Sequence, residues 1–494
     1  MKTKKNKFVE IIFFIIIFLF FFIFFAKVHP IILFDTDDWY NSIFTRGAYP
    51  IIGEWNPTKV LPEILMPFVV TYGNYFMSLF SNNFIYNVIY VNSFVISLFI
   101  TIYVSLFYKL LRKRNNSHQV TNILITIIFI IFHFLIFRSS KIDSYYMFYA
   151  MDMSCYYHYL IPVLLNCSLV MFYLNNDSFI YKDSKIKTSF MLLILYLSMF
   201  SNIYSNIVLT TFIGITLIYR VIDSKLLKKK NFKKKNILKF LKENTIELSI
   251  IIVWIITQIL EYGGGRAKVL MHNESLKNIF IKLGSVFKNP NTSFIIVLIL
   301  CLIIGIIYFI KNKLYKNIKV IICILSMVLT FIYIILLTTK TGAKYIERMD
   351  VLFGFIFFIF IFMSFTIFYI MKKYDKLLLC LPLITIILFF ETSSLRTSSN
   401  NIYPKYRESN LYNIPHDVYI KVEELIMNQI KENIDNPGAT IYIPYTTADN
   451  NWPIIKDDAY RITYGMYKHG LIKKYVEFEY VISKEFYDDN IELK

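Results

Sequence analysis

The sequence predicts an α-helical polytopic membrane protein of about 11 transmembrane helices with a small extracytoplasmic α/β domain at its C-terminal end. Three observations support this fold class. Of the 494 residues, 56% are hydrophobic, and the mean hydropathy is +0.51. Apolar runs long enough to cross a bilayer core of about 30 Å recur along residues 1–391. Residues 392–494 lack such runs.

The first apolar run, residues 8–26, follows the basic start MKTKKNK. It is longer than the apolar region of a typical signal peptide, and no small-residue cleavage site follows it. We therefore expect an uncleaved first transmembrane helix, with the N-terminus in the cytoplasm of a multi-pass cell-membrane protein.

Further apolar runs fit transmembrane helices, several of them only with tilt or with neighbouring helices. They are residues 84–108, 120–137, 156–174, 188–201, 204–219, 246–262, 292–310, 319–338, 351–371 and 376–391. Clusters of Lys and Arg follow every second run, so all of them fall on the side of the N-terminus, as expected for cytoplasmic loops. This alternation predicts that the C-terminal segment is extracytoplasmic.

The net charge of +19 is unevenly distributed. Residues 1–391 hold 41 Lys and Arg against 19 Asp and Glu, whereas residues 392–494 hold 12 against 15. The positive charge therefore accompanies the membrane part and marks its cytoplasmic loops, so we expect no nucleic acid partner. The five cysteines are far apart without a CxxC motif, which indicates neither a disulfide framework nor a zinc site.

Residues 27–83 form the predicted first outer loop. Its segment 64–80 is apolar enough for a short span, but counting it would invert the charge alternation downstream. Pro57, Pro62 and Pro67 would also break a straight helix. We expect residues 57–82 to form helices that lie in or dip into the outer interface.

Residues 392–494 are the predicted extracytoplasmic α/β domain, and residues 1–391 the transmembrane domain. Residues 416–435 have helical periodicity, and Asn436-Pro-Gly ends the helix. Its predicted apolar face is made of Val418, Val422, Leu425 and Ile426. Residues 439–445 and 474–482 alternate like strands.

Polar groups suited to chemistry gather in the predicted outer loops. The first loop begins with Asp35-Thr36-Asp37-Asp38-Trp39, and crowded carboxyl groups raise one another's pKa toward the range of a general base. The competing explanation is a solvated helix end. Trp39 and Trp55 offer flat faces to a sugar ring or to the membrane interface.

Later outer loops supply cations. Gly263, Gly264 and Gly265 free the backbone next to Arg266 and Lys268, which suits a phosphate clamp or simply a flexible loop. The strand, the Lys-Ser/Thr pair and the cytoplasmic location of a nucleotide-binding P-loop are missing. In a third loop, Lys344 and Arg348 lie at a membrane boundary, where a guanidinium snorkels or holds a lipid phosphate.

These features together resemble the GT-C class of polytopic glycosyltransferases, in particular bacterial members that act on cell-surface polysaccharides. The resemblance rests on the uncleaved first helix, the acidic motif 35–39, the long first outer loop and the outer C-terminal domain. It implies inverting transfer of a sugar from a polyprenyl-phosphate donor to a cell-surface glycan or teichoic-acid-like acceptor. Asp37 or Asp38 would act as the base. Some members use a divalent metal, and the sequence leaves this open.

The resemblance also implies contacts with the lipid-linked donor, the glycan acceptor and membrane lipid. The expected substrate-binding residues are Asp35, Trp39, Arg46, Trp55, Glu63, Arg266, Lys268, Lys344 and Arg348. Two alternatives remain. A transporter of lipid-linked sugar or lipid would explain the spans, although it favours charges near the bilayer midplane. A non-catalytic membrane component of wall assembly would use the C-terminal domain for binding.

Overall fold

The computed structural model describes most of the chain. The described residues are 2–44, 47–51, 53–114, 119–136, 148, 150, 152–181, 183–224, 233–270, 272–286, 291–374, 380–391, 416–445, 449–451 and 453–483. The first transmembrane helix is α1 (Lys2–Ile23), which continues as the π-helix η1 (Phe24–Val28). It ends before His29-Pro30, because proline disfavours helical geometry in the residue that precedes it.

The protein is an α-helical polytopic membrane protein. The other helices of the main bundle are α4 (Phe84–Arg114), α5 (Gln119–Leu135), α7 (Ile161–Asn176), α8 (Lys185–Met199), α9 (Asn206–Asp223), α11 (Thr245–Gly263), α14 (Thr292–Lys311), α15 (Ile318–Thr341), α16 (Met349–Lys373) and α17 (Leu381–Glu391). Within the described residues, 8 helices are long and apolar enough to cross a membrane, and α5 and α17 are shorter apolar helices. Each predicted span coincides with a helix, while the total of 11 crossings stays a prediction.

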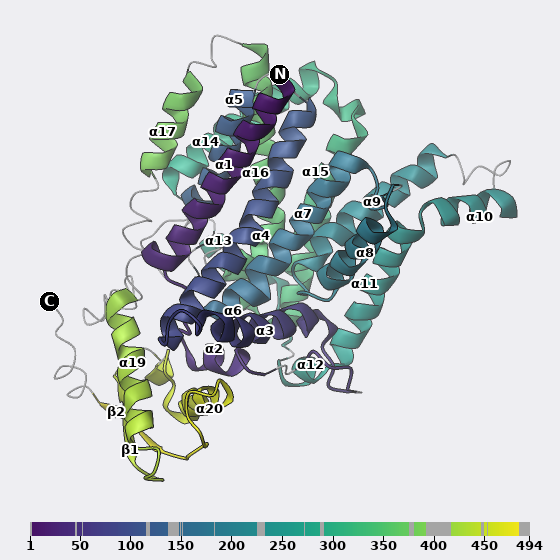
Figure 1. Ribbon diagram of the computed structural model, residues 1–494. Coiled ribbons are helices and arrows are strands. Elements are labelled where there is room, and N and C mark those ends of the chain that lie inside the picture. Colours follow the sequence, from purple (N-terminus) through teal and green to yellow (C-terminus); the bar gives the residue numbers. More distant parts are fainter. Residues whose placement is uncertain are drawn as a thin grey trace.

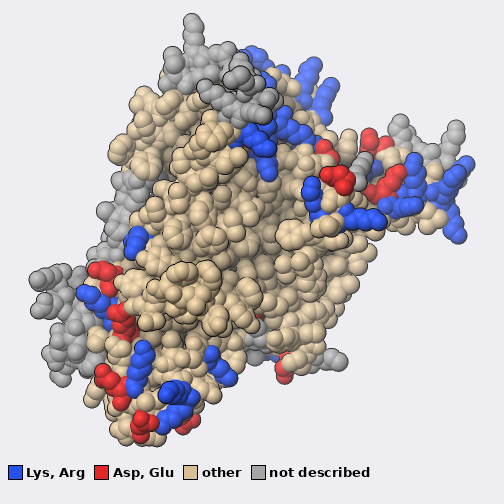
Figure 2. All heavy atoms as spheres, in the orientation of Figure 1, with Lys and Arg blue, Asp and Glu red and all other residues tan. Residues whose placement is uncertain are grey.

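Burial separates central from peripheral helices. In the apolar windows of the span that contains α7 and of α16, 83% and 72% of the residues are buried. The corresponding shares in α14 and α11 are 17% and 22%. The large exposed aliphatic side chains of these outer helices therefore face the lipid. Figure 2 shows charged side chains gathered toward both ends of the molecule, with a nearly uncharged band between them.

The first outer loop contains short elements and one long helix. They are α2 (Thr36–Asn41), the 3-10 helix η2 (Pro57–Lys59) and α3 (Val60–Met77). In Figure 1, α3 runs across the ends of the bundle helices instead of along them, which agrees with the predicted interfacial segment. The prolines were expected to break a straight helix, but they do not interrupt α3. Pro62 lies in its first turn, where a backbone N–H has no hydrogen-bond partner within the helix, and Pro67 is accommodated inside the helix.

Shorter elements connect the rest of the bundle. They are α6 (Met153–Cys155), the π-helix η3 (Tyr156–Leu160), α10 (Lys234–Glu243), α12 (Gly265–Leu270), α13 (Leu276–Val286), the 3-10 helix η4 (Leu314–Lys316) and the 3-10 helix η5 (Ala343–Glu347). The segments α6 and η3 lead directly into α7, so that residues 153–176 are one continuous helical stretch.

The C-terminal part has mixed helix and strand structure, as predicted. It contains α19 (His416–Glu432), β1 (Thr440–Pro444), the 3-10 helices η7 (Asp449–Asn451) and η8 (Lys456–Asp458), α20 (Tyr460–Lys468) and β2 (Glu479–Ser483). The two strands pair in parallel, with Thr440 opposite Glu479. The second strand starts five residues later than expected, because residues 474–478 lie outside the paired ladder.

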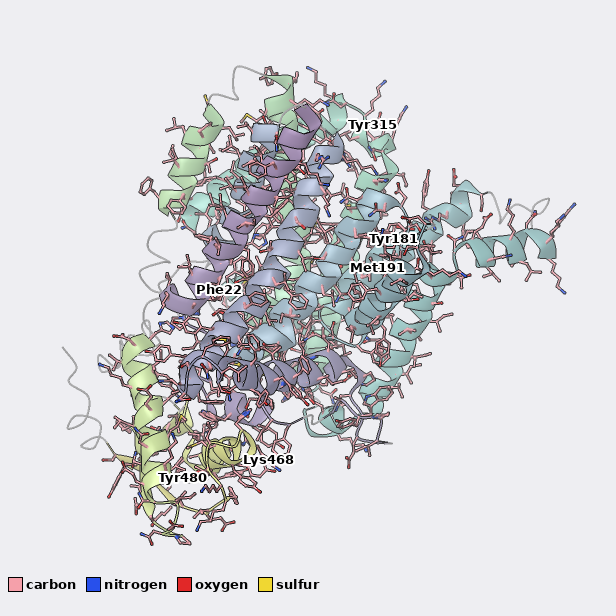
Figure 3. The ribbon with its side chains drawn as sticks, in the orientation of Figure 1. Phe22, Tyr181, Met191, Tyr315, Lys468 and Tyr480 are labelled. Carbon is pink, nitrogen blue, oxygen red and sulfur yellow. The ribbon has the colours of Figure 1, made fainter. Side chains whose placement is uncertain are left out.

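The C-terminal domain packs directly on the acidic end of the first loop. The Tyr419 hydroxyl donates to the Phe34 carbonyl at 2.5 Å, and Ser42 Oγ lies 2.9 Å from His469 Nε2. In Figure 1 this domain lies at the opposite end of the bundle from the N-terminus. Figure 3 shows the same separation, with Lys468 and Tyr480 at one end and Tyr315 at the other.

Candidate functional site

Asp35 is the N-cap of α2. Its backbone is extended, with φ −125° and ψ 174°, and its Oδ1 accepts a hydrogen bond from the Asp38 amide at 2.7 Å. This bond satisfies an amide at the start of the helix that has no partner within it. Burial and the neighbouring carboxylates of Asp38, Asp152 and Asp37 raise the pKa of Asp35.

Asp38 is fully buried and ties two segments of the chain together. Its Oδ2 accepts hydrogen bonds from the amides of Phe34 at 3.0 Å and Met153 at 2.7 Å. Its Oδ1 accepts from the Ser154 amide at 2.7 Å. The carboxylate thus caps the start of α6 from another part of the sequence. Burial raises the pKa of Asp38 to about 6, although these hydrogen bonds act in the opposite direction.

Asp37 has a different environment from Asp38, although the two residues are adjacent. Its side chain is 59% exposed and forms an ion pair with Arg461 of α20. Arg461 also contacts Asp458 at 2.7 Å, and its guanidinium lies 5.1 Å from the centre of the Tyr40 ring. Of the two candidate bases, Asp37 is therefore the one that an acceptor can reach, and the C-terminal domain holds it.

A further carboxyl group, Asp152, belongs to this acidic cluster. It immediately precedes α6 and is 8% exposed, and the Cys155 thiol lies 3.5 Å from its Oδ2. Burial and the nearby Asp38 raise the pKa of Asp152 to about 8, while the Arg348 cation lowers it. Asp152 was not among the site residues expected from the sequence. Its position one residue before a helix start is a capping signal, but the proximity to Asp38 arises only in the fold.

Arg348 lies beside the acidic cluster but already has partners. Its Nη2 and Nε contact the two carboxylate oxygens of Asp350 at 2.6 and 3.1 Å. Its guanidinium also lies 4.1 Å from the centre of the Tyr159 ring, and its Nη2 is 3.5 Å from Cys155 Sγ. This bidentate pair fixes the guanidinium plane next to Asp152.

A cavity of about 320 Å³ opens between the ends of α11 and α15, next to η3 and η5. Its lining contains cations, tyrosines, amides and one carboxylate. The lining residues are Thr58, Lys59, Tyr159, Asn202, Ile203, Tyr204, Gln258, Glu261, Tyr262, Arg266, Ala267, Leu337, Lys340, Thr341 and Tyr345. Glu261 is held by Thr58, whose amide and hydroxyl donate to its Oε1 at 2.7 and 2.6 Å.

Arg266 is a half-buried cation of the cavity lining that has no carboxylate partner in direct contact within the described part of the chain. Its Nη2 donates to the Tyr345 hydroxyl at 3.4 Å, and no carboxylate oxygen among the described residues lies within 4.0 Å of it. By comparison, Lys59 Nζ lies 2.9 Å from His158 Nδ1, and Lys340 Nζ donates to Asn273 at 2.9 Å. The guanidinium of Arg266 is therefore positioned to receive an anion in the cavity.

Two tyrosines connect the cavity with the acidic cluster. Tyr159 and Tyr345 both line the cavity and both lie against the Arg348 guanidinium, at 4.1 and 5.9 Å from their ring centres. Tyr159 belongs to the π-helix η3, which follows the segment that Asp38 caps. Such π-helical turns often occur at functional sites. The cavity and the carboxylates are therefore parts of one region.

Gly264, the middle residue of the triple glycine, has a structural reason that the sequence did not reveal. A Cβ on Gly264 would lie 2.5 Å from Asn56 Oδ1 and 2.7 Å from the Trp55 carbonyl oxygen. Only glycine permits this close approach of the loop before α12 to the first outer loop. The contact places Arg266 against the segment that contains η2.

The remaining predicted site residues lie around this region. Trp39 is 2% exposed and stacks on Phe84 at 5.9 Å, while Trp55 stacks on Phe200 at 6.0 Å. Glu63 is 2% exposed, and its Oε2 accepts from the Gly47 amide at 2.6 Å. The exposed cations stand outside the cavity lining: Lys268 donates to the Gly53 carbonyl at 2.8 Å, and Lys344 lies over the Tyr345 ring. Arg46 lies outside the described residues.

Two residues of this site could not be identified from the sequence pattern. Arg461 lies in a helix of the C-terminal domain, and Glu423 lies on α19, where it is 4% exposed. Both face the first loop, and Glu423 lines a small cavity together with Asp35 and Trp39. Burial, followed by the charge of Asp38, raises the pKa of Glu423.

No metal centre is apparent in the described part of the chain, where no group of three or more His, Cys, Asp and Glu side chains is arranged to hold a metal ion. The oxygens of Asp38 instead accept three backbone N–H groups.

Comparisons with protein-family models, with curated proteins and with solved structures found no match for this chain. The function is therefore inferred from the arrangement of the side chains of this chain.

Proposed function

We propose that the chain is a membrane glycosyltransferase. It transfers a sugar from a polyprenyl-phosphate donor to a cell-surface glycan, such as a teichoic-acid-like polymer, at the outer face of the cell membrane. The observation that supports this most directly is the cavity lined by the cation Arg266, which is joined through Tyr159 and Tyr345 to the cluster of Asp37, Asp38 and Asp152.

The walls of the cavity fit a lipid-linked substrate. The cavity lies between α11 and α15, two helices that are mostly exposed on the surface of the bundle. Tyr262, one of its lining residues, is 71% exposed, and Leu337 and Ile203 add apolar surface. A polyprenyl chain would lie along these helices in the lipid, and its phosphate would enter beside Arg266 and Lys59. A sugar on that phosphate would extend over the tyrosines toward the carboxylates.

The proposed reaction is a single inverting displacement. An acceptor hydroxyl attacks the anomeric carbon and forms the new C–O bond, while the bond from that carbon to the phosphate oxygen breaks. The proton of the hydroxyl passes to Asp37, and the polyprenyl phosphate leaves with the bonding electron pair. We assign the base to Asp37 because a base must reach the acceptor, and the side chain of Asp38 is fully buried. Asp38 is a positioning residue that holds the loop against α6.

The cations act on the leaving group. Negative charge grows on the phosphate oxygen as the bond breaks, and preorganised donors lower the energy of that transition state. Arg266 is the main donor in this scheme, with Lys59 and Lys340 in the same cavity. Arg348 supports the site indirectly, because its pair with Asp350 fixes Tyr159 and moderates the charge of Asp152.

The test uses the purified full-length chain in proteoliposomes that contain polyprenyl-phosphate sugars and a wall-glycan acceptor. Arg266→Gln should lower kcat about 10²–10³-fold, the usual effect of removing one such donor. Lys268→Gln is the matched control, since Lys268 is a neighbouring cation outside the cavity lining and should leave transfer unchanged.

Transfer by Arg266→Gln at the rate of the parent chain would contradict the assignment. Gene deletion separates transfer from the transport alternative. Loss of one sugar substituent from the wall polysaccharide supports transfer. Accumulation of an intact lipid-linked precursor inside the cell would instead identify a transporter.

A further inference from the structure

The helix α10 is amphipathic and, among the described residues, its apolar side is only partly covered: Ile237 and Phe240 are half-buried, and Phe240 packs against the core. None of its residues is buried. Ile237, Leu238, Phe240 and Leu241 fall on one side at 3.6 residues per turn, and Leu238 and Leu241 are 55% and 44% exposed. A soluble helix with such exposed leucines would lose the free energy of burying them. The apolar face of α10 therefore needs a partner.

The opposite side of α10 is basic. The helix contains four lysines and one glutamate, Glu243, which lies 3.8 Å from Lys239. Lys239 lies on the opposite side of the helix from Ile237 and Leu241, whereas Lys235 and Lys242, three residues before and four residues after Leu238, flank the apolar side. Among the described residues, no carboxylate oxygen lies within 4.0 Å of Lys235 or Lys242. Figure 2 shows Lys and Arg side chains gathered over this projecting helix.

The position of α10 places both faces at a membrane surface. The transmembrane helix α11 begins at Thr245, two residues after α10 ends. Asn244 forms the corner between them: it is 4% exposed, and its Oδ1 accepts from Arg220 Nη1 at 2.6 Å. Figure 1 shows α10 turning away from the bundle, across the direction of α11. The helix therefore lies in the plane where the transmembrane helices emerge from the lipid.

We propose that α10 is a binding site for anionic phospholipid headgroups on the leaflet that faces the basic ends of the helices. Its leucines enter the boundary between headgroups and acyl chains, and its lysines contact the headgroup phosphates. Both properties are characteristic of in-plane amphipathic helices. A nucleic acid would satisfy the lysines but not the leucines. The proposal is independent of the transferase activity.

The experiment measures lipid bound to the detergent-solubilised full-length chain by native mass spectrometry. The chain is titrated with phosphatidylglycerol and, separately, with phosphatidylcholine of the same acyl chains. We expect preferential binding of phosphatidylglycerol. The triple variant Lys235→Gln, Lys239→Gln, Lys242→Gln should weaken it by about fivefold for each lysine removed. Because no residue of α10 is buried, thermal unfolding of this variant should match the parent chain.

A matched control removes three other lysines at the same end of the bundle. Lys311→Gln, Lys313→Gln, Lys316→Gln changes the connection between α14 and α15, which has no amphipathic helix, and should retain the binding. Equal losses in the two triple variants, or equal binding of both lipids, would overturn the proposal. A second variant, Leu238→Ser with Leu241→Ser, should also lose binding. If phosphatidylglycerol is retained by this pair, the apolar face is not part of the site and the proposal fails.

Discussion

The adjacent residues Asp37 and Asp38 lie in different environments because successive side chains of a helix point in directions about 100° apart. One side chain points to the solvent and to Arg461, and the other points inward to the amides of α6. A carboxylate that accepts three backbone hydrogen bonds is fixed in place, whereas one with an exposed surface is free to take up a proton from another molecule. Substitutions of Asp37 and of Asp38 are therefore expected to have different effects.

Asp37→Asn should lower kcat by about 10²–10⁴-fold, which is the usual contribution of a general base, with little change in thermal unfolding. Asp458→Asn serves as the control, because it removes the other ion-pair partner of Arg461 and leaves the base intact. Transfer assays on both variants decide the matter. A fully active Asp37→Asn variant would show that Asp37 is not the base, and Asp38 would be the next residue to test.

Stability should fall as the pH rises through the acidic range. The pKa of Asp38 is raised from 3.8 to about 6 in the folded chain, so the folded state binds its proton more tightly than the unfolded state. The stabilisation of the folded state by the bound proton is fully present below pH 3.8 and is lost as the pH rises to about 6. It amounts to roughly 3 kcal/mol in the free energy of unfolding. Thermal unfolding measured between pH 3.8 and 6 should show this loss of stability. In the Asp38→Asn variant, stability should depend less on pH. An unchanged slope in that variant would contradict the assignment.

The residues of the site were only partly predictable. The motif at 35–39 is contiguous, so its crowding is visible in the sequence. Asp152, Arg461 and Glu423 reach the site from segments more than a hundred residues away, and no local pattern marks that meeting. Arg348 was recognised as a boundary cation, but its pair with Asp350 depends on side-chain geometry.

At the level of elements, close helix packing depends on glycine. A Cβ on Gly354 of α16 would lie 2.3 Å from Val208 Cγ2 of α9, a β-branched side chain with little freedom to move. Gly284 of α13 has no atom within 4 Å of the corresponding position. The same substitution therefore has opposite consequences in the two helices.

Gly354→Ala should destabilise the chain by about 1–3 kcal/mol through overpacking. Gly284→Ala should stabilise it by up to about 1 kcal/mol, because alanine favours helix. Thermal unfolding in detergent compares the two variants with the parent chain. Equal shifts of the unfolding temperature would show that the contact between α16 and α9 is looser than described.

The existence of the long helices was largely predictable, because the length of an apolar run can be compared directly with the thickness of a bilayer. Their ends and interruptions were not. The continuity of α3 through Pro67 and the π-helical turn at η3 depend on tertiary contacts that can replace a missing backbone hydrogen bond.

At the scale of the whole molecule, the N-terminus and the C-terminal domain lie at opposite ends of the bundle. An odd number of membrane crossings would produce this arrangement, and the total of 11 stays a prediction. The charge alternation predicted the orientation, but the docking of the C-terminal domain on α2 was beyond sequence reasoning, since it joins residues separated by the entire bundle.

A labelling experiment tests the orientation. In a Cys380→Ser background, Lys468→Cys should react with a membrane-impermeant maleimide in intact cells, because the C-terminal domain is predicted to be extracytoplasmic. Tyr315→Cys, at the other end of the molecule in Figure 3, should react only after permeabilisation. Reaction of both variants in intact cells would contradict the proposed topology.

The ion pair between Asp37 and Arg461 also has a consequence for biosynthesis. The two residues are 424 positions apart, so the ribosome synthesises all the helices of the bundle before the second partner exists. The acidic motif emerges early, and it acquires its final surroundings only when the last helix and strand have folded outside the membrane. A message that ends before the codon for Arg461 would therefore yield an inserted bundle in which Asp37 lacks its ion-pair partner.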